Sequence, residues 1–181
     1  APAMYNDETI IESMMNVGYS LEDARNYVAI GCVEPTAPGK SLASTDAGMY
    51  NMPLAVEMAL NEGKQFHSSK QIGAKTPPVS EMRSMDDFVA AYDTQVKHQL
   101  GKLRRDLEAI ERFHAEHHPT PLTSSMVEGC VEQGVCSTSG GAIYNFSGIQ
   151  GCGMATVADS LGAIESAVFE DKWLTLEELV A

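Results

Sequence analysis

Apolar residues recur at steps of three and four along two long stretches of the chain, the pattern that predicts amphipathic helices. The first stretch begins after Ser84, a residue suited to an N-terminal cap, and runs to about His117, before Pro119. The second runs from Thr156 to Phe169. One seam of the first helix is expected to face the core: Phe88, Tyr92, Val96, Leu100, Leu103, Leu107, Ile110 and His114.

Shorter helices are predicted by capping residues next to apolar positions. Ser20 is placed to cap one of them, Pro53 lies in the first turn of another, and Gly134 follows a third as its C-cap. The pair Thr175 and Glu178 forms a capping box that opens a last helix. The other predicted ranges are 8–17, 21–27, 51–61 and 123–132.

The segments between these helices predict one strand and several loops. Val28-Ala29-Ile30 is a compact apolar run, which predicts a buried strand that leads Cys32 into a loop. The stretch from Pro35 to about Ser44 and the polar stretch 64–84 predict loops. Residues 137–153 are rich in glycine, and Asn145-Phe146-Ser147 within them fits a strand poorly. No internal repeat or linker divides the chain, which indicates one domain.

Composition narrows the classes of function. Of the 181 residues, 44% are hydrophobic and 20% charged, and the formal net charge is −13, which argues against nucleic acid or an anionic membrane as a partner. No apolar run approaches the roughly 20 residues of a membrane span. The first residues are polar and acidic, unlike a signal peptide. The four cysteines form no CxxC pair, so we expect free thiols in a reducing cytoplasm rather than a metal site.

The stretch Gly31-Cys32-Val33-Glu34-Pro35 carries the strongest candidate chemistry. In an extended segment, side chains two residues apart point the same way, so Cys32 and Glu34 are expected to face one space. Pro35 keeps Glu34 extended, and Gly31 lets the backbone approach another segment closely. A thiol and a carboxylate are thereby predicted to act together.

This stretch and the residues before it, 24–35, resemble the thiyl-radical loop of glycyl radical enzymes, the pyruvate formate-lyase superfamily. The likeness is greatest to the eliminase branch of diol dehydratases, choline lyase, hydroxyproline dehydratase and isethionate lyase. It implies that Cys32, as a thiyl radical, abstracts hydrogen from the substrate while Glu34 removes the proton of the adjacent hydroxyl. The ketyl-like radical then expels a neighbouring group. Val33 stands where pyruvate formate-lyase has a second cysteine, so acyl transfer is not expected.

The resemblance continues through residues 40–51 and 119–172 and so covers nearly the whole chain. Asp46 matches a substrate-binding aspartate of diol dehydratases, and Thr45 falls where choline lyase has a polar threonine. Those dehydratases carry Trp-His where this chain has Ser44-Thr45. This departure leaves the substrate open, and Asp46 could instead cap the helix that follows.

By this resemblance the fold is α/β: residues 1–181 form a helix-rich part of one ten-stranded β/α barrel domain, without the N-terminal half or the C-terminal glycyl radical domain. Gly18-Tyr19 lacks the arginine of the radical loop and precedes Cys32, so the radical glycine is expected outside this chain. The implied partners are a small-molecule substrate, an S-adenosylmethionine radical activating enzyme and a second copy in an anaerobic homodimer. The chain itself is expected to bind no cofactor and no metal.

Other interpretations stay open beside the lyase. The nearest is an arylacetate-type radical decarboxylase, because some of these enzymes also carry Cys-x-Glu. A non-catalytic fragment or scaffold of the same fold is another, and a cysteine hydrolase is a third. His114 and His118, four residues apart, fit an exposed helix end better than a metal site, and the glycines at 148, 151 and 153 do not follow the order of a dinucleotide fingerprint.

Overall fold

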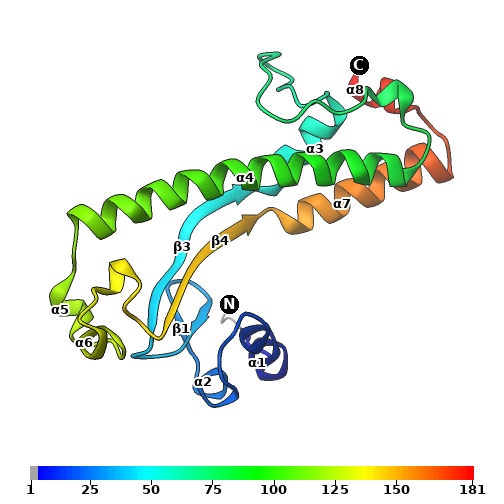
Figure 1. Ribbon diagram of the computed structural model, residues 1–181. Helices are drawn as coiled ribbons and strands as arrows, with labels where there is room; N and C mark the ends of the chain where they lie inside the picture. The colour runs from blue at the N-terminus through cyan, green and yellow to red at the C-terminus, as the bar shows by residue number, and fades with distance from the viewer. Residues whose placement is uncertain (1–3) are drawn as a thin grey trace. The chain divides into compact units, whose positions relative to one another are not determined.

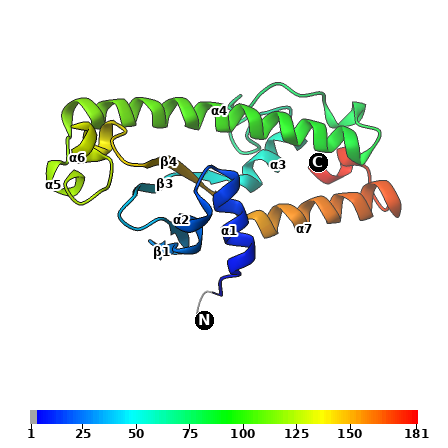
Figure 2. The ribbon, with the colours of Figure 1, turned by 60° about the horizontal axis from the view of Figure 1, so that its bottom comes forward.

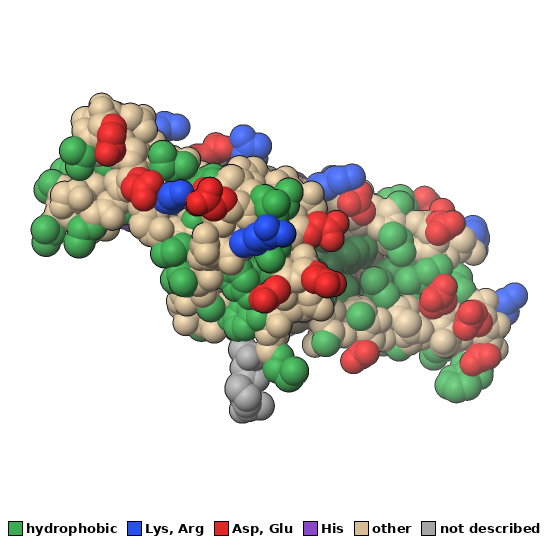
Figure 3. Space-filling model, turned by 90° about the horizontal axis from the view of Figure 1, so that it is seen from below, with side chains coloured by type: hydrophobic (Ala, Val, Ile, Leu, Met, Phe, Trp, Pro, Cys, Tyr) green, Lys and Arg blue, Asp and Glu red, His purple; other side chains and the backbone are tan. Residues whose placement is uncertain are grey.

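The computed structural model describes residues 4–181 (Figure 1). They group into two compact units, which are described separately below. Unit 1 holds the chain up to Gly48 and then Leu107–Ile149, and unit 2 holds Met49–Asp106 and Gln150–Ala181. Acidic side chains are spread over the face shown in Figure 3, in keeping with the net charge of −13.

Unit 1 begins with two short helices, which lie side by side in Figures 1 and 2. Helix α1 spans Asp7–Asn16 and helix α2 spans Leu21–Arg25, close to the predicted ranges. The Ser20 hydroxyl accepts a hydrogen bond from the Asp23 backbone N–H, so the predicted cap is confirmed. Their apolar sides form a small core of Met14, Tyr19, Ala24 and Ala37.

A β-hairpin follows these helices. Strand β1, Val28–Ile30, pairs antiparallel with strand β2, Glu34–Thr36, so that Ile30 lies opposite Glu34. The predicted strand is confirmed, but its burial is not, because Val28 is 41% exposed. The loop predicted from Pro35 to about Ser44 is present but shorter, at residues 37–40, because β2 extends to Thr36 and β3, Ser41–Asn51, begins five residues later.

Strand β3 pairs with β4, Tyr144–Cys152, and the arrows of both point the same way in Figure 1. The prediction that Asn145-Phe146-Ser147 fits a strand poorly is therefore wrong. A Cβ on Gly148 would lie 2.4 Å from the carbonyl oxygen of Thr45, so glycine lets the strands approach here. Gly148 is therefore the glycine that this pairing requires.

Backbone hydrogen bonds join three segments of unit 1 that are far apart in sequence. The Glu128 N–H donates to the Gly39 carbonyl at 2.8 Å, and the Ile143 N–H donates to the Glu128 carbonyl at 3.2 Å. Beside them, the Tyr144 N–H donates to the Lys40 carbonyl at 2.9 Å. The loop after the hairpin is thus tied to the segment that leads into β4.

The single helix predicted at 123–132 is instead two short ones, α5 at Pro121–Ser124 and α6 at Cys130–Gln133. Gly129, with φ of 94°, lies between them in a left-handed conformation that a continuous helix cannot include. Gly134 ends α6 in the αL conformation, as predicted. A 3-10 turn, η2, follows at Ser137–Ser139.

Helix α4 spans Met85–His117, as predicted, and contributes to both units. Its seam is buried at Phe88 and Leu107 but exposed at Ile110 and His114, so the predicted seam does not extend to the end of the helix. No pattern in the sequence predicted the burial of Gln95, which is 0% exposed. Its side-chain amide accepts a hydrogen bond from the Ala74 N–H and donates one to the Ala74 carbonyl.

Unit 2 is built from helices around one core. Helix α3 spans Met52–Leu60 with Pro53 in its first turn, and α7 spans Met154–Ile164 and continues as a π-helical segment, η3, at Glu165–Glu170. The core contains Val56, Ala59, Met82, Phe88, Ala91, Val157, Ile164 and Leu176. The helices predicted at 51–61 and 156–169 are thus confirmed with small shifts, and the stretch 64–84 is a loop apart from a 3-10 turn, η1, at Val79–Glu81.

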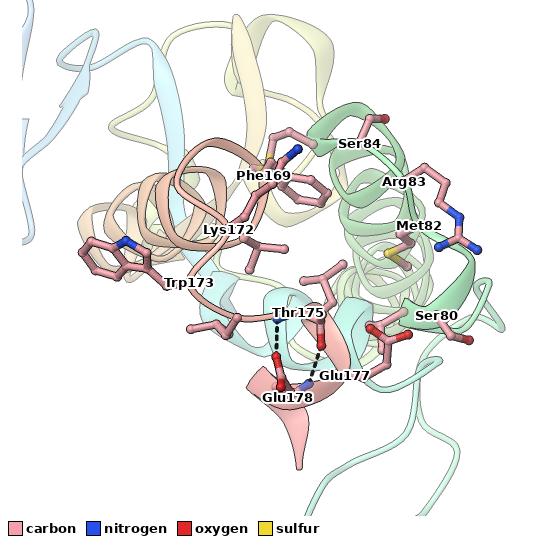
Figure 4. A pocket seen from close by; sticks show the side chains of 15 residues that line it. Ser80, Met82, Arg83, Ser84, Phe169, Lys172, Trp173, Thr175, Glu177 and Glu178 are labelled. Atoms are coloured by element: carbon pink, nitrogen blue, oxygen red, sulfur yellow. Dashed lines mark hydrogen bonds between the residues drawn. The ribbon is translucent and has the colours of Figure 1, made fainter.

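The chain ends in helix α8, Leu176–Val180, beside a pocket of about 580 Å³ (Figure 4). The Thr175 N–H donates to the Glu178 carboxylate at 2.8 Å and the Glu178 N–H donates to the Thr175 hydroxyl at 3.1 Å, which confirms the predicted capping box. The residues lining this pocket come from Val79–Met85 and Val168–Glu178 and include none of the predicted site residues. No helix in the part of the chain that the structure describes is long and apolar enough to cross a membrane.

Candidate active site on the hairpin turn

Cys32 lies at the turn of the β1–β2 hairpin. Residues 31–33 form this turn, so the strand leads Cys32 into a loop as predicted, but Cys32 and Glu34 do not share one extended segment. Its side chain is exposed, and within the described part of the chain its sulfur makes no hydrogen bond. The pairing of Ile30 with Glu34 places the thiol on the loop that joins the two strands. A thiol in this position is open to a reaction partner.

Glu34 is extended in β2, as Pro35 predicted, but in contrast to Cys32 it is buried, with 9% of its surface exposed. Its Oε2 accepts a hydrogen bond of 2.9 Å from the Val33 N–H, so the carboxylate folds back over the turn. The turn leaves little room for it: a Cβ on Gly31 would lie 2.6 Å from that oxygen. Gly31 also has φ of 57°, a conformation that favours glycine. Glycine at this position therefore serves both the turn and the carboxylate.

Asp46 and Thr45 are neighbours in β3. Asp46 is exposed and Thr45 is half-buried. Because side chains alternate along a strand, the two lie on opposite faces of β3. Only one of them can therefore project from this strand toward a given substrate.

Ser44 shares its face of β3 with Asp46 and lines a pocket of about 260 Å³ within unit 1. The pocket also contains Glu111 and His114 of α4, and the Ser147 hydroxyl donates a hydrogen bond to the Glu111 carboxylate. Of its polar lining residues only Ser44 lies near Asp46 in sequence, and Asp46 itself does not line the pocket.

The segment that follows the hairpin is anchored by an ion pair that the sequence did not reveal. The Lys40 ammonium lies 2.6 Å from Asp23 Oδ1, and the Tyr144 hydroxyl donates to Asp23 Oδ2 at 2.6 Å. The hydrogen bonds from Lys40, from Tyr144 and from the Ser20 hydroxyl lower the pKa of Asp23 from 3.8 to about 2. The charged carboxylate thereby holds together α2, the start of β3 and the start of β4.

No metal centre is formed by the described residues, among which no three His, Cys, Asp or Glu side chains are grouped so as to hold an ion. The rings of His114 and His118 have centroids 5.9 Å apart at the exposed end of α4. Cys136 lies in a network of hydroxyl groups in another part of unit 1, and no motif in the sequence indicated it.

Comparison with known proteins supports the resemblance drawn from the sequence. The family model described as pyruvate formate lyase-like matches residues 1–181. A (2S)-3-sulfopropanediol dehydratase of Klebsiella oxytoca is 37% identical over 94% of this chain and 21% of its own length. The glycerol-bound B12-independent glycerol dehydratase from Clostridium butyricum superposes with a TM-score of 0.92 at 42% identity, over 99% of this chain and 23% of its own. A glycyl radical enzyme from Archaeoglobus fulgidus gives a TM-score of 0.88 at 36% identity, over 96% of this chain and 22% of its own.

The chain thus spans about a fifth of the length of the relatives it matches. The predicted α/β fold of glycyl radical enzymes is confirmed by these matches.

Proposed function

Because the chain belongs to the pyruvate formate lyase-like family, we propose that the polypeptide containing it is a glycyl radical lyase. It would cleave a C–O, C–N or C–S bond of a small hydroxylated substrate. The observation that carries the proposal is the hairpin turn, where an exposed Cys32 follows Gly31 and precedes a buried Glu34. Both groups needed for hydrogen and proton removal are offered by one four-residue segment.

The proposed reaction divides the work between these two side chains. A protein glycyl radical outside this chain, installed by an S-adenosylmethionine radical enzyme, would take the hydrogen atom of the Cys32 thiol and leave a thiyl radical on the sulfur. Cys32 would take a hydrogen atom from the substrate carbon that bears the hydroxyl. Glu34 would accept the hydroxyl proton, and the resulting ketyl-like radical would release the neighbouring group. The product radical would then recover a hydrogen atom from the Cys32 thiol.

The surroundings of each side chain suit these roles. No donor among the described residues holds the Cys32 sulfur, so a substrate can approach it without displacing a partner. The Val33 N–H fixes one oxygen of Glu34, which orients the carboxylate before a substrate arrives. Burial also suits a carboxylate base, because it removes competing water.

Substrate binding is proposed for Asp46 rather than Thr45. The two lie on opposite faces of β3, and Asp46 is the more exposed. Ser44-Thr45 departs from the Trp-His of diol dehydratases, so the substrate is proposed only as a small hydroxylated molecule. The matching of dehydratases at 37–42% identity favours elimination over decarboxylation.

The test uses the full-length polypeptide, activated anaerobically and assayed against a panel of diols and amino or sulfonate alcohols. Cys32→Ala and Glu34→Gln should each reduce turnover by at least about 10³-fold while leaving the circular dichroism spectrum unchanged. Cys152→Ser is the matched control, because Cys152 is also an exposed thiol, and it should retain activity. Substantial turnover by Cys32→Ala would exclude the radical role, and an inactive wild type would favour the scaffold.

A further inference from the structure

A pair of cysteines lies in unit 1, far from the hairpin turn in sequence. Cys130 and Cys136 line the same pocket of about 400 Å³, together with prolines and valines. Cys130 is 3% exposed, and its thiol has no hydrogen-bond partner among the described residues. Cys136 is half-buried and so remains reachable from the pocket. The pocket therefore offers apolar walls and two sulfur atoms.

Hydrogen-bonding groups surround the sulfur of Cys136. The Thr120 N–H donates to it at 3.1 Å, and the hydroxyl groups of Ser124 and Thr138 lie at 3.1 and 3.2 Å. A thiolate accepts from all three more strongly than a thiol does, since charge-assisted hydrogen bonds are the stronger ones. Ser124 has a single hydroxyl proton, which the Thr120 carbonyl can also accept at 2.7 Å. Thr120 N–H and Thr138 are therefore the steadier donors.

Electrostatics agree with this geometry. Hydrogen bonds from Ser124, from Thr138 and from the Thr120 backbone lower the pKa of Cys136 from 9.0 to about 5. Burial raises the pKa of Cys130 in the same pocket, and Cys136 and Glu132 raise it further. Cys130 is the one other titratable residue that lines the described pocket. The surroundings thus favour the thiolate form of Cys136 and the thiol form of Cys130.

We propose that Cys136 is a modification site for small apolar electrophiles of the α,β-unsaturated carbonyl class, which bind in the pocket beside it. The apolar lining residues Pro119, Pro121, Val131 and Val135 select neutral molecules, and the hydrogen-bonding groups around the sulfur hold it ready to react. Cys130 contributes to the wall and stays protonated.

The proposed reaction is an addition. The Cys136 sulfur forms a bond to the β-carbon of the electrophile, and the carbon–carbon π pair moves onto the carbonyl oxygen. The enolate then takes a proton from water, which balances the proton that Cys136 releases on ionising. No electron donor or acceptor is needed. The alkylated sulfur carries no charge, so it is a weaker acceptor for Thr120, Ser124 and Thr138 than the thiolate was.

The experiment measures alkylation of the full-length polypeptide by N-ethylmaleimide, itself an α,β-unsaturated carbonyl compound, with site-resolved mass spectrometry at pH 6 and pH 8. N-acetylcysteine serves as the reference thiol, and its rate should rise on the order of 50- to 100-fold over this interval. The Cys136 rate should change by less than about 2-fold, because a thiol with a pKa of about 5 is already ionised at pH 6. Radical activation is not required, so the result does not depend on the lyase proposal.

Thr138→Val supplies the test of cause, because it removes one hydroxyl near the sulfur and keeps the side-chain shape. The pH dependence of Cys136 alkylation should steepen to about 2- to 4-fold or more. Thr123→Val is the matched control on the exposed side of α5 and should match the wild type. The proposal is overturned if Cys136 follows N-acetylcysteine in its pH dependence. It is equally overturned if Cys136 stays unmodified while the exposed Cys152 reacts.

Discussion

Cys32 and Cys136 occupy opposite kinds of surroundings within the same unit. Cys32 is exposed on a hairpin turn, without a hydrogen bond in the described part of the chain, next to a buried carboxylate. Cys136 is half-buried among neutral hydrogen-bonding groups that stabilise a thiolate. A sulfur that exchanges hydrogen atoms gains nothing from stabilising the anion, whereas a sulfur that adds to electrophiles gains directly. The two environments therefore suit the two proposed reactions, hydrogen-atom transfer at Cys32 and addition to an electrophile at Cys136.

After the loss of Cys32 or Glu34 themselves, the largest effect on turnover is expected from a change in the backbone of the hairpin turn. Gly31→Ala would place a Cβ 2.6 Å from Glu34 Oε2 and should displace the carboxylate. Turnover of the activated full-length enzyme should fall about 10- to 100-fold, because a small misplacement of a catalytic group is costly. Steady-state assays under anaerobic conditions measure it. Alkylation of Cys136 should not change.

Gly39→Ala is the matched control for that variant. Gly39 has φ of 72°, similar to the 57° of Gly31, but no atom lies within 4 Å of its added Cβ. It therefore carries the same kind of backbone strain, on the order of 1 kcal/mol, without displacing Glu34. Equal losses of turnover in the two variants would attribute the effect to strain and not to the carboxylate.

A smaller effect, a change in KM, is expected from substitutions in β3, where the two candidate binding residues lie on opposite faces. Asp46→Asn should raise KM about tenfold with little change in kcat, if the carboxylate bonds the substrate in ground and transition states alike. Thr45→Val should change KM by less than about twofold. The reverse ranking would assign substrate binding to the Thr45 face.

The smallest effect, a change in local stability, is expected from the ion pair between Lys40 and Asp23, which anchors the segment that follows the hairpin. The pKa of Asp23 is lowered in the folded state. The contribution of the Asp23 carboxylate to stability is therefore fully present above pH 3.8 and is lost as the pH falls toward 2. Amide hydrogen exchange in α2 should therefore speed up between pH 4 and pH 2, after allowance for the intrinsic rate. Around Cys136 no further loss from its sulfur is expected there, because a thiolate with a pKa of about 5 is already protonated by pH 4.

Asp23→Asn should remove that acid-dependent change in α2, since an amide has no charge to lose. Asp93→Asn provides the comparison, because Asp93 forms an exposed ion pair with Lys97 on α4 and such pairs contribute little. An unchanged pH dependence in Asp23→Asn would show that another group anchors the segment.

Local signals predicted most of the helices. Ser20, Ser84 and Thr175 are caps whose hydrogen bonds depend on residues three positions away, so the sequence alone contains both partners. The predictions that failed concerned elements whose partners are distant in sequence. Strand β4 is a strand because β3 lies beside it, and its glycines count against it only when it is considered alone.

The candidate site was predictable to the same extent. Cys32 and Glu34 were singled out from their spacing, and a loop at Cys32 was predicted. That this loop is a hairpin turn was not predicted, because the turn depends on the pairing of Ile30 with Glu34. The donors around Cys136 come from Thr120, Ser124 and Thr138 with no recurring spacing. A sequence pattern cannot reveal a cluster that exists only once the chain has folded.

The hydrogen bonds that join Gly39, Glu128 and Ile143 have a consequence for how this region assembles. Contacts between residues so distant in sequence pay a large loop-closure entropy and are slow to form. The hairpin can form early from its own residues, but the segment that follows it gains its ties only when the chain past α4 arrives. A chain truncated before Glu128 should therefore keep the residues of the hairpin but lose the backbone bonds that hold the segment after it.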